Sequence, residues 1–396
     1  MSKRKRTPSP SDSASLALTR DNLRRLQESL SPPAKMSRRS SPTRTRNNLD
    51  ARTKLEAYRI YVDTEHAYPS ALTHFIDTVI RRPRDPAGLI SPNARNVVEK
   101  RRKTATSNER TATSVLTPWL LFVGEADGDD RGTPVLHITA KQDIGLNKFF
   151  TPEAPNPLVA KTWGKLSAAQ PDSCIGYVTS RDARNAGTEA LFDMNEETIL
   201  HDFSLTQYMH FPFLTAQWKV PNSNENLHSA QNQAARDGAA IVNQLYDLYA
   251  TTDSAPPSVV HTCHFSVQND LQHGGLWVHW REGDEHYMEL VFDFSMRDQA
   301  ALETLRSFLH NILDNALGPR LQSLKAVLPK FHEKQKKGEY PMVQPAADEG
   351  TPSESAVSQP PSLSDLQYNF TVPLTPSSAP SEPDKSRKRA RYGSIT

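Results

Sequence analysis

The sequence predicts a mixed α/β (α+β) protein, and two observations support that class. In the middle of the chain, short apolar runs typical of buried strands alternate with segments of helical periodicity; CIGYV within residues 173–179 is one such run. Between residues 259 and 294, three strand-like runs follow one another without a helix, which is typical of an antiparallel sheet.

The charge distribution divides the chain into three segments. Residues 1–48 carry 12 Lys and Arg against 3 Asp and Glu, and residues 341–396 carry 5 against 6. Residues 49–340 carry 30 against 36, and they hold all 5 tryptophans. Because both ends are rich in Ser and Pro and lack apolar periodicity, we expect a disordered basic head, one folded body over 49–340 and a disordered tail.

The folded body begins with helices and ends with strands followed by helices. Apolar residues at helical spacing predict a long helix over 226–250, and Gly318-Pro319 predicts the end of the helix 298–317. The other predicted helices are 50–62, 69–81, 93–114, 158–166 and 320–328. The predicted strands are 133–139, 173–179, 211–220, 259–267, 276–280 and 287–294, with 180–210 as a polar insertion.

Several classes of protein are disfavoured by what the sequence contains. The chain has only 2 cysteines, Cys174 and Cys263, too few for a disulfide scaffold or a four-cysteine zinc site. Its longest apolar stretch, near Trp119, is far shorter than the ~20 residues of a membrane span. The first residues have no apolar core of a secretory signal, and no phosphate loop or nucleophile elbow occurs. We therefore expect a non-secreted protein without a membrane partner.

Two clusters near the predicted hairpin have alternative interpretations. His261, Cys263 and His264 form the run HTCH, in which alternation places His261 and Cys263 on one strand face. Two neighbouring ligands do not make a zinc site, so a half-buried strand is favoured. The aromatic residues in the hairpin are either base-stacking groups or cross-strand packing, and packing is favoured; they are Trp277, His279, Trp280 and Tyr287.

The strongest functional signal is a pair of motifs at the ends of two predicted strands. Pro171-Asp172 precedes one strand, Gln217-Trp218-Lys219 ends the next, and a helix follows. A Pro-Asp and an acid-x-Lys placed in this way resemble the motif of PD-(D/E)XK nucleases. The longer stretches PDSCIGYVTSRDA, LTQYMHFPFLTAQWK, AQNQAARDGAAIVNQL and LWVHWREGDEHYMELVFDFSMRD resemble a largely uncharacterised group of fungal PD-(D/E)XK nuclease-like proteins, over about residues 50–330.

The resemblance implies a restriction-endonuclease-like core and a site for Mg²⁺-dependent cleavage of phosphodiester bonds. In such a site a metal held by hard oxygen ligands activates water and neutralises charge on the phosphate. By resemblance, Asp172, Gln217 and the backbone carbonyl of Trp218 are the metal ligands, and Lys219 is the catalytic lysine. Gln231 and Gln233 are candidate supporting residues on the following helix, although a polar helix face explains them equally well.

Position 217 departs from the motif, because it is Gln where the motif has Asp or Glu. A neutral amide removes one negative charge, so we expect weak metal affinity. Glu197 and Asp202 are the acids considered as replacements. Two functions therefore remain open: a metal-dependent nuclease, or a catalytically inactive nuclease fold that serves as a binding, scaffold or regulatory protein.

Basic clusters in both ends predict nuclear localisation through an import receptor, or tethering to DNA or RNA. They comprise Lys3, Arg4, Lys5 and Arg6 in the head and Arg387, Lys388 and Arg389 in the tail. The adjacent Thr7-Pro8 and Ser9-Pro10 pairs are candidate phosphorylation sites, and added negative charge there would weaken binding by the cluster.

Overall fold

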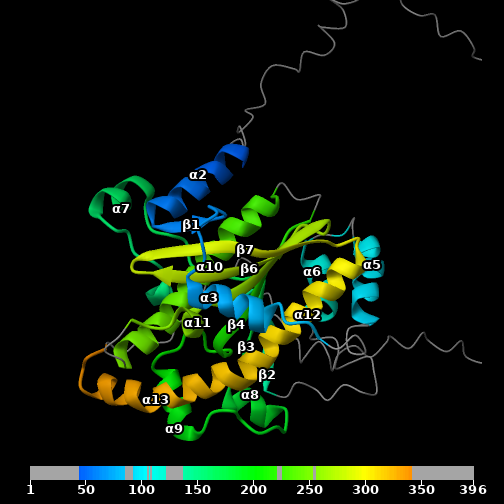
Figure 1. The fold of residues 1–396 in the computed structure, drawn as a ribbon. Coiled ribbons are helices and arrows are strands. Elements are labelled where there is room, and N and C mark those ends of the chain that lie inside the picture. Colours follow the sequence, from blue (N-terminus) through cyan, green and yellow to red (C-terminus); the bar gives the residue numbers. More distant parts are fainter. Residues whose placement is uncertain are drawn as a thin grey trace, which may run out of the picture. The chain divides into compact units, whose positions relative to one another are not determined.

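A computed structural model describes residues 44–84, 92–104, 107, 109–121, 137–220, 225–252 and 256–340. The terminal basic clusters lie outside these residues. The described chain is a mixed α/β fold in which helices pack on both faces of one sheet (Figure 1). The predicted fold class is confirmed.

The sheet is mixed and has seven strands in the described part of the chain, in the order β1-β7-β6-β5-β4-β3-β2. The pairs β1–β7 and β4–β5 are parallel and the other four are antiparallel. The strands are β1 (Ile60–Val62), β2 (Ile138–Gln142), β3 (Ser173–Tyr177), β4 (His210–Trp218), β5 (His264–Asn269), β6 (His273–Glu282) and β7 (Glu285–Ser295).

Most of the predicted helices are present, with changed boundaries. They are α2 (Arg44–Ala57), α3 (Ser70–Phe75) with the π-turn η1 (Ile76–Ile80), α5 (Pro92–Thr104), α6 (Glu109–Leu120), η3 (Lys148–Phe150), α7 (Pro157–Trp163), α8 (Ser180–Asn185), α9 (Met194–His201), α10 (Leu227–Thr252), α11 (Val259–Thr262), α12 (Gln299–Asn315), η4 (Ala316–Arg320) and α13 (Leu321–Lys336). No helix among them has the length and apolar composition needed to cross a membrane.

The structure corrects four boundaries. The helix predicted over 50–62 ends at Ala57, because Arg59 takes a φ of 59° and the chain then enters β1. The charged segment 93–114 forms two helices, α5 and α6. The predicted strand 259–267 opens as α11. Gly318, with φ −108° and ψ −105°, breaks the helical path between α12 and α13 as predicted, but α13 runs to Lys336, beyond the expected end at 328.

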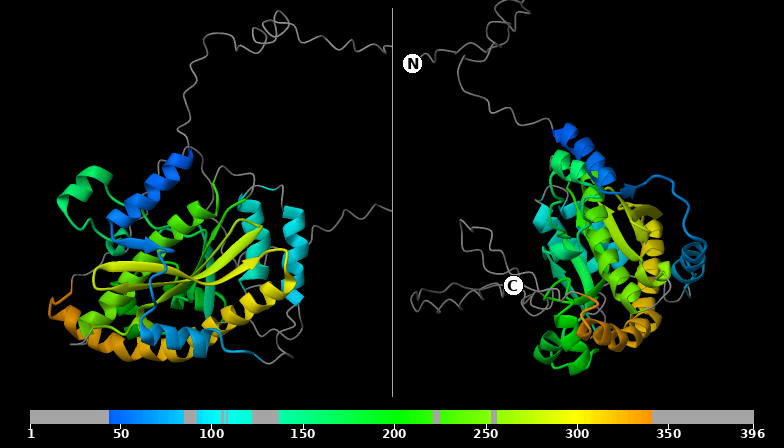
Figure 2. Two further views of the ribbon diagram at one scale, coloured as in Figure 1. Left: turned by 45° about the horizontal axis from the view of Figure 1, so that its top comes forward. Right: turned by 90° about the vertical axis from the view of Figure 1, so that its left-hand side faces the viewer.

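The two faces of the sheet are covered by different helices (Figure 2). Gly238 of α10 lies against the ring of His279 in β6, where an added Cβ would stand 2.2 Å from the ring nitrogen. This close contact places α10 directly on one face. On the opposite face Phe75 of α3 packs near Phe265 of β5, with ring centroids 6.4 Å apart.

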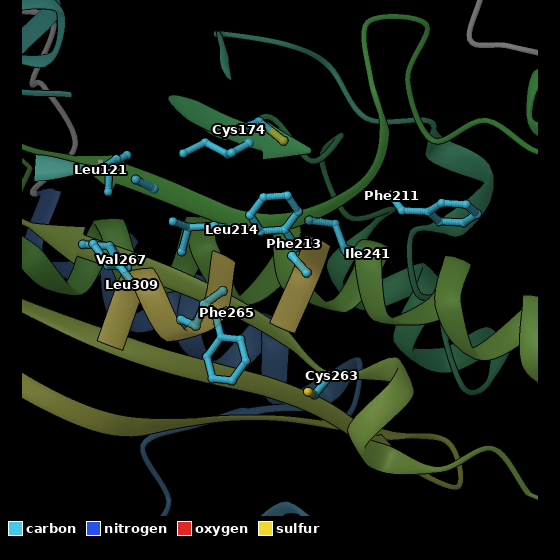
Figure 3. Close-up of a cluster of buried hydrophobic side chains, with 14 of the residues drawn as sticks. Leu121, Cys174, Phe211, Phe213, Leu214, Ile241, Cys263, Phe265, Val267 and Leu309 are labelled. Atoms are coloured by element: carbon cyan, nitrogen blue, oxygen red, sulfur yellow. The ribbon is translucent and has the colours of Figure 1, made fainter. Parts of the chain in front are cut away.

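The apolar core fills both sides of the central strands (Figure 3). Buried side chains from the sheet meet buried side chains from the covering helices. The labelled set includes Cys174 of β3, Phe211, Phe213 and Leu214 of β4, Phe265 and Val267 of β5, Ile241 of α10 and Leu309 of α12. Cys174 and Cys263 are buried free thiols, so the folding of this body does not depend on a disulfide between them.

The hairpin aromatics pack in the interior, as favoured from the sequence. Trp277, His279 and Trp280 are at most 3% exposed, and Tyr287 is 8% exposed. Tyr287 stacks on Trp280 at a centroid distance of 5.3 Å. These side chains are therefore not available for stacking on bases. The expected alternation of His261 and Cys263 is wrong, because His261 belongs to α11 and the strand starts at His264.

Candidate functional site

The Pro-Asp and x-Lys segments meet at the end of the β3–β4 pair. The register pairs Ser173 with Ala216, which places Asp172 beside Gln217 on the neighbouring strand. The backbone N–H of Trp218 donates a hydrogen bond to Oδ2 of Asp172 at 2.7 Å. The carboxylate of Asp172 thus continues the strand pairing at the point where backbone pairing stops. Residues 46 positions apart are brought together in this way.

Lys219 is held at this edge by carboxylates from two other segments. Its Nζ lies 3.0 Å from Oε2 of Glu225, just before α10, and 3.4 Å from Oε1 of Glu109, the first residue of α6. Its backbone N–H donates to the carbonyl of Asn269 at the end of β5. The Lys219 side chain is only 3% exposed, whereas those of Glu109 and Glu225 are 34% and 48% exposed. The edge is therefore a partly open cluster of charges around one buried ammonium group; we call Glu109, Asp172, Lys219 and Glu225 the charged edge.

Burial and neighbouring charges give the charged edge unusual proton affinities. Burial raises the pKa of Asp172 to about 7, against the opposing effects of the Trp218 hydrogen bond and the Lys219 charge; Glu109 and Asp143 raise it further. For Lys219, burial lowers the pKa, but Asp172, Glu225 and Glu109 together outweigh burial, so that the pKa is raised. At neutral pH Lys219 is charged, and Asp172 is close to half-ionised.

Gln217 points from the same strand into the interior, toward α10. Its Nε2 donates to Oδ2 of Asp237 at 2.6 Å and to the carbonyl of Gln170 at 3.3 Å. The backbone N–H of Gln170 donates to the other carboxylate oxygen of Asp237 at 3.0 Å, and Arg236 lies 3.7 Å from that oxygen. Gln217 and Asp237 are 1% and 0% exposed. The amide is therefore engaged with a buried carboxylate, and burial raises the pKa of Asp237.

The contacts of the two α10 glutamines, Gln231 and Gln233, are on the side of α10 that faces α2. Gln231 accepts a hydrogen bond from Nη2 of Arg52 at 3.3 Å, so it joins α10 to α2. Gln233 lines a pocket between the same two helices. Neither contact involves Asp172 or Lys219. These contacts do not support the expected role of Gln231 and Gln233 beside the metal ligands, and a polar helix face is the simpler description.

Neither acid considered as a replacement reaches the charged edge. Glu197 accepts hydrogen bonds from Ser180 and pairs with His210 at 3.1 Å. His210 begins β4 and Gln217 lies seven residues further on, a separation of roughly 23 Å along a strand. Asp202 pairs with its neighbour His201 at 3.2 Å.

The acids that contact the motif residues are instead Glu109, Glu225 and Asp237. Glu109 belongs to the segment 93–114, which the sequence predicts as one helix, and Asp237 lies inside the long helix predicted over 226–250. A single acid at the start of a helix is not part of a sequence motif, so no pattern could have identified Glu109 as a site residue. The only signal for Asp237 was a charge on the apolar face of α10.

The donor set partly fits a hard divalent cation. Asp172 offers a carboxylate and the Trp218 carbonyl an oxygen at the same edge, and Glu109 is a second nearby carboxylate. The Gln217 side chain does not fit as a ligand while its amide is bound to Asp237 and Gln170. In the described segments, no group of three or more His, Cys, Asp or Glu side chains is arranged to hold a metal ion. A cation at this edge would have one or two protein carboxylates and take its remaining ligands from water or substrate.

The fold and the site together define a mixed α/β protein with a charged site at the ends of its central strands. The chain belongs to the family described as a domain of unknown function, DUF7924, whose model matches residues 84–328. The matched segment includes every member of the charged edge and begins after α2, β1 and α3. No curated protein matches the chain.

Proposed function

We propose that this protein is a nucleic-acid-associated member of the PD-(D/E)XK nuclease-like group, and that its charged edge hydrolyses phosphodiester bonds with the help of Mg²⁺. The observation that carries the proposal is the 2.7 Å hydrogen bond from Trp218 N–H to Asp172. It joins the Pro-Asp segment to the x-Lys segment, and α10 follows directly, in the order that the motif requires.

Each member of the edge has a chemical role in this proposal. A bound Mg²⁺ would supply Lewis acidity and a water of lowered pKa. Asp172 and the Trp218 carbonyl would hold the ion, with Glu109 as a further carboxylate within reach. Lys219, charged and fixed between Glu109 and Glu225, stabilises negative charge that develops on phosphate oxygens. Because Asp172 has a pKa of about 7, metal binding competes with a proton and strengthens as the pH rises.

The direct test incubates the purified full chain with labelled single- and double-stranded DNA and RNA and with Mg²⁺ or Mn²⁺. We expect cleavage that chelation abolishes and that falls at least about 100-fold in Asp172→Asn and in Lys219→Met. The matched controls are Asp314→Asn, whose side chain is 54% exposed in α12, and Lys161→Met in α7. Equal cleavage by the wild type and by both site variants would refute catalysis at this edge.

A catalytically inactive nuclease fold is the second candidate, and the Gln217–Asp237 pair favours it. The carboxylate of this pair belongs to Asp237, which is buried on α10, whereas the motif would place the acid at position 217 on β4. A single Gln217→Glu change would oppose two carboxylates, so it tests little. The double variant Gln217→Glu with Asp237→Asn reverses the direction of the hydrogen bond and moves the charge to β4. Metal-dependent cleavage gained only in the double variant would indicate a disabled site.

Nuclear localisation remains part of the proposal and rests on the terminal basic clusters. Replacing Lys3, Arg4, Lys5 and Arg6 by Ala, and separately Arg387, Lys388 and Arg389, should shift a fluorescent fusion of the full chain toward the cytoplasm. Replacing an equal number of basic residues on the folded surface is the control. An unchanged nuclear fraction when both clusters are removed would contradict an import signal.

A further inference from the structure

A pocket between α2 and α10 lies beside the charged edge. It has a volume of about 180 Å³. The pocket is lined by side chains that include Lys54 of α2, Ser167 of the loop between α7 and β3, Glu225, and Gln233 and Arg236 of α10. Glu225 is also the residue paired with Lys219 at 3.0 Å. One ion pair therefore separates this pocket from the charged edge.

Two cations lie in this pocket close enough to influence each other. Burial lowers the pKa of Lys54, and the positive charge of Arg236 lowers it further. Nζ of Lys54 donates to the carbonyl of Lys165 at 2.6 Å, and Nη1 of Arg236 donates to the Ser167 hydroxyl at 2.6 Å. Both of these acceptors are neutral. The nearest carboxylate to Arg236 is that of Asp237 at 3.7 Å, which is already shared with Gln217 and Gln170.

Hydrogen-bonding capacity remains unused at the same place. Nε of Arg236 and Oε1 of Gln233 are buried and have no hydrogen-bond partner among the described residues. Arg has five N–H donors and no acceptor, so only an acceptor can complete its bonding. The unpartnered atom of Gln233 is an acceptor, so its amide must turn over before Nε2 can donate to an anion. Two repelling cations with spare donors favour an acceptor-only anion.

The pocket size limits that anion to a small group. Pockets for drug-sized ligands occupy roughly 300–1,000 Å³, and this one is smaller. A tetrahedral phosphate group with its attached sugar edge is compatible with the space and with Arg–Lys recognition. Glu225 lines the pocket and pairs with Lys219, so a phosphate bound here would lie one ion pair away from the charged edge.

We propose that this pocket binds one backbone phosphate of the nucleic acid, with Lys54 and Arg236 as its ligands. The inference rests on the proposed function for the identity of the polymer, and it adds a subsite that the motif does not contain. Lys54 lies before residue 84, where the family match begins. Helix α2 therefore completes a substrate-binding surface whose other half belongs to the family domain.

The test measures binding of a labelled 12-nucleotide DNA and RNA to the full chain by fluorescence polarisation, with metal chelated and at several salt concentrations. We expect Lys54→Gln and Arg236→Gln each to weaken binding about tenfold. Each should also reduce the slope of log affinity against log salt by about 0.7–1. Lys161→Gln in α7 and Arg95→Gln in α5, two exposed cations outside the pocket, are the matched controls and should change affinity less than twofold.

Each outcome is decisive because folding is followed separately by thermal unfolding. Folded Lys54→Gln protein with wild-type affinity and salt slope would overturn the subsite, as would equal losses in the controls. Binding that depends on Lys54 and Arg236 in a chain that cleaves nothing supports the subsite while hydrolysis fails. If inorganic phosphate stabilises the wild type but not the two variants, and neither polymer binds, the pocket serves a small phosphorylated molecule and the polymer subsite is refuted.

Discussion

Two neighbouring regions of the sheet use polar residues for opposite purposes. The charged edge places Asp172 and Lys219 where Glu109 and Glu225 remain one-third to one-half exposed. Between α10 and the sheet lies a buried polar layer, formed by Thr215, Gln217, Asp237, His264, Ser266, Gln268 and His279. Gln217 is the penultimate residue of β4 and Lys219 follows the end of that strand, yet each belongs to a different region.

The difference between them lies in what satisfies each group. In the buried layer, hydroxyl and imidazole groups pair with each other: Thr215 bonds His264 at 2.9 Å and Ser266 bonds His279 at 2.5 Å. The carboxylate of this layer, Asp237, accepts hydrogen bonds from Gln217 and Gln170. Burial lowers the pKa of His279 to about 3, so that ring stays neutral. At the edge, formal charges face each other with solvent nearby. Polar residues alone therefore do not mark a site; access to solvent and unbalanced charge do.

The largest expected effect is on the pH dependence of stability, and it should arise from the charged edge rather than from the buried polar layer. The folded-state pKa of Asp172, about 7, lies above the ordinary aspartate value of 3.8, so the folded protein binds more protons than the unfolded chain between these pH values. The wild type should therefore lose stability as the pH rises from about 4 to about 7, by at most about 4 kcal/mol. Asp172→Asn should lack this loss, so its stability relative to wild type rises over the same window.

Urea denaturation at pH 4, 5.5, 7 and 8 measures the effect, with Asp314→Asn, at a 54% exposed carboxylate of α12, as the control variant. A constant difference between Asp172→Asn and wild type at all four pH values would contradict the raised pKa.

A smaller loss is expected from removing the carboxylate of the buried layer. Asp237→Ala leaves Gln217 and the Gln170 N–H without their acceptor and should cost about 3 kcal/mol of unfolding free energy. Asp237→Asn should also destabilise, because two amide groups then face each other. Adding Gln217→Glu to Asp237→Asn should recover about 1–2 kcal/mol. Additive losses in that double-mutant cycle would show that the two side chains do not interact as described.

The sequence predicts most of the secondary structure because local periodicity controls it. The strand CIGYV and the helix from Leu227 were located within about two residues from apolar spacing. Errors arose where tertiary contacts decided the conformation. Residues 60–62 continue a helical pattern, but parallel pairing with β7 makes them a strand. Residues 259–262 were predicted as part of a strand but form α11, because an apolar run of that length is compatible with either a helix or a strand.

The site could be predicted only in part. The motif indicated Asp172 and Lys219, and the structure places both at one edge. The motif could not show that the Gln217 side chain is hydrogen-bonded to Asp237, because no local pattern links a strand residue to a helix residue 20 positions later. Glu109 was beyond prediction for the same reason, being 110 residues from Lys219. Charged contacts made across the fold leave no periodic trace in the chain.

A third prediction tests how tightly the buried layer is closed. Gly238 of α10 faces the His279 ring, and a Cβ there would lie 2.2 Å from Nδ1. Gly238→Ala should therefore cost about 2 kcal/mol through overpacking, and adding His279→Ala should recover part of it. Gly145→Ala, where an added Cβ meets nothing within 4 Å, is the control and should change stability by less than about 0.5 kcal/mol. A neutral Gly238→Ala would mean that α10 stands further from β6.

The smallest effects sharpen the description of the edge itself, because two single changes should move the same titration in opposite directions. Lys219 lowers the pKa of Asp172 and Glu109 raises it, with Lys219 the larger influence. Lys219→Met should therefore raise the pKa of Asp172, and Glu109→Gln should lower it by less. Carbon-detected NMR of the aspartate carboxyl groups follows the titration, with Asp172→Asn assigning the resonance. Glu303→Gln, at a half-buried position of α12, is the control for a general change in charge. Shifts of the same sign in both variants would mean that these residues act through altered folding, since only direct charge interactions require opposite signs.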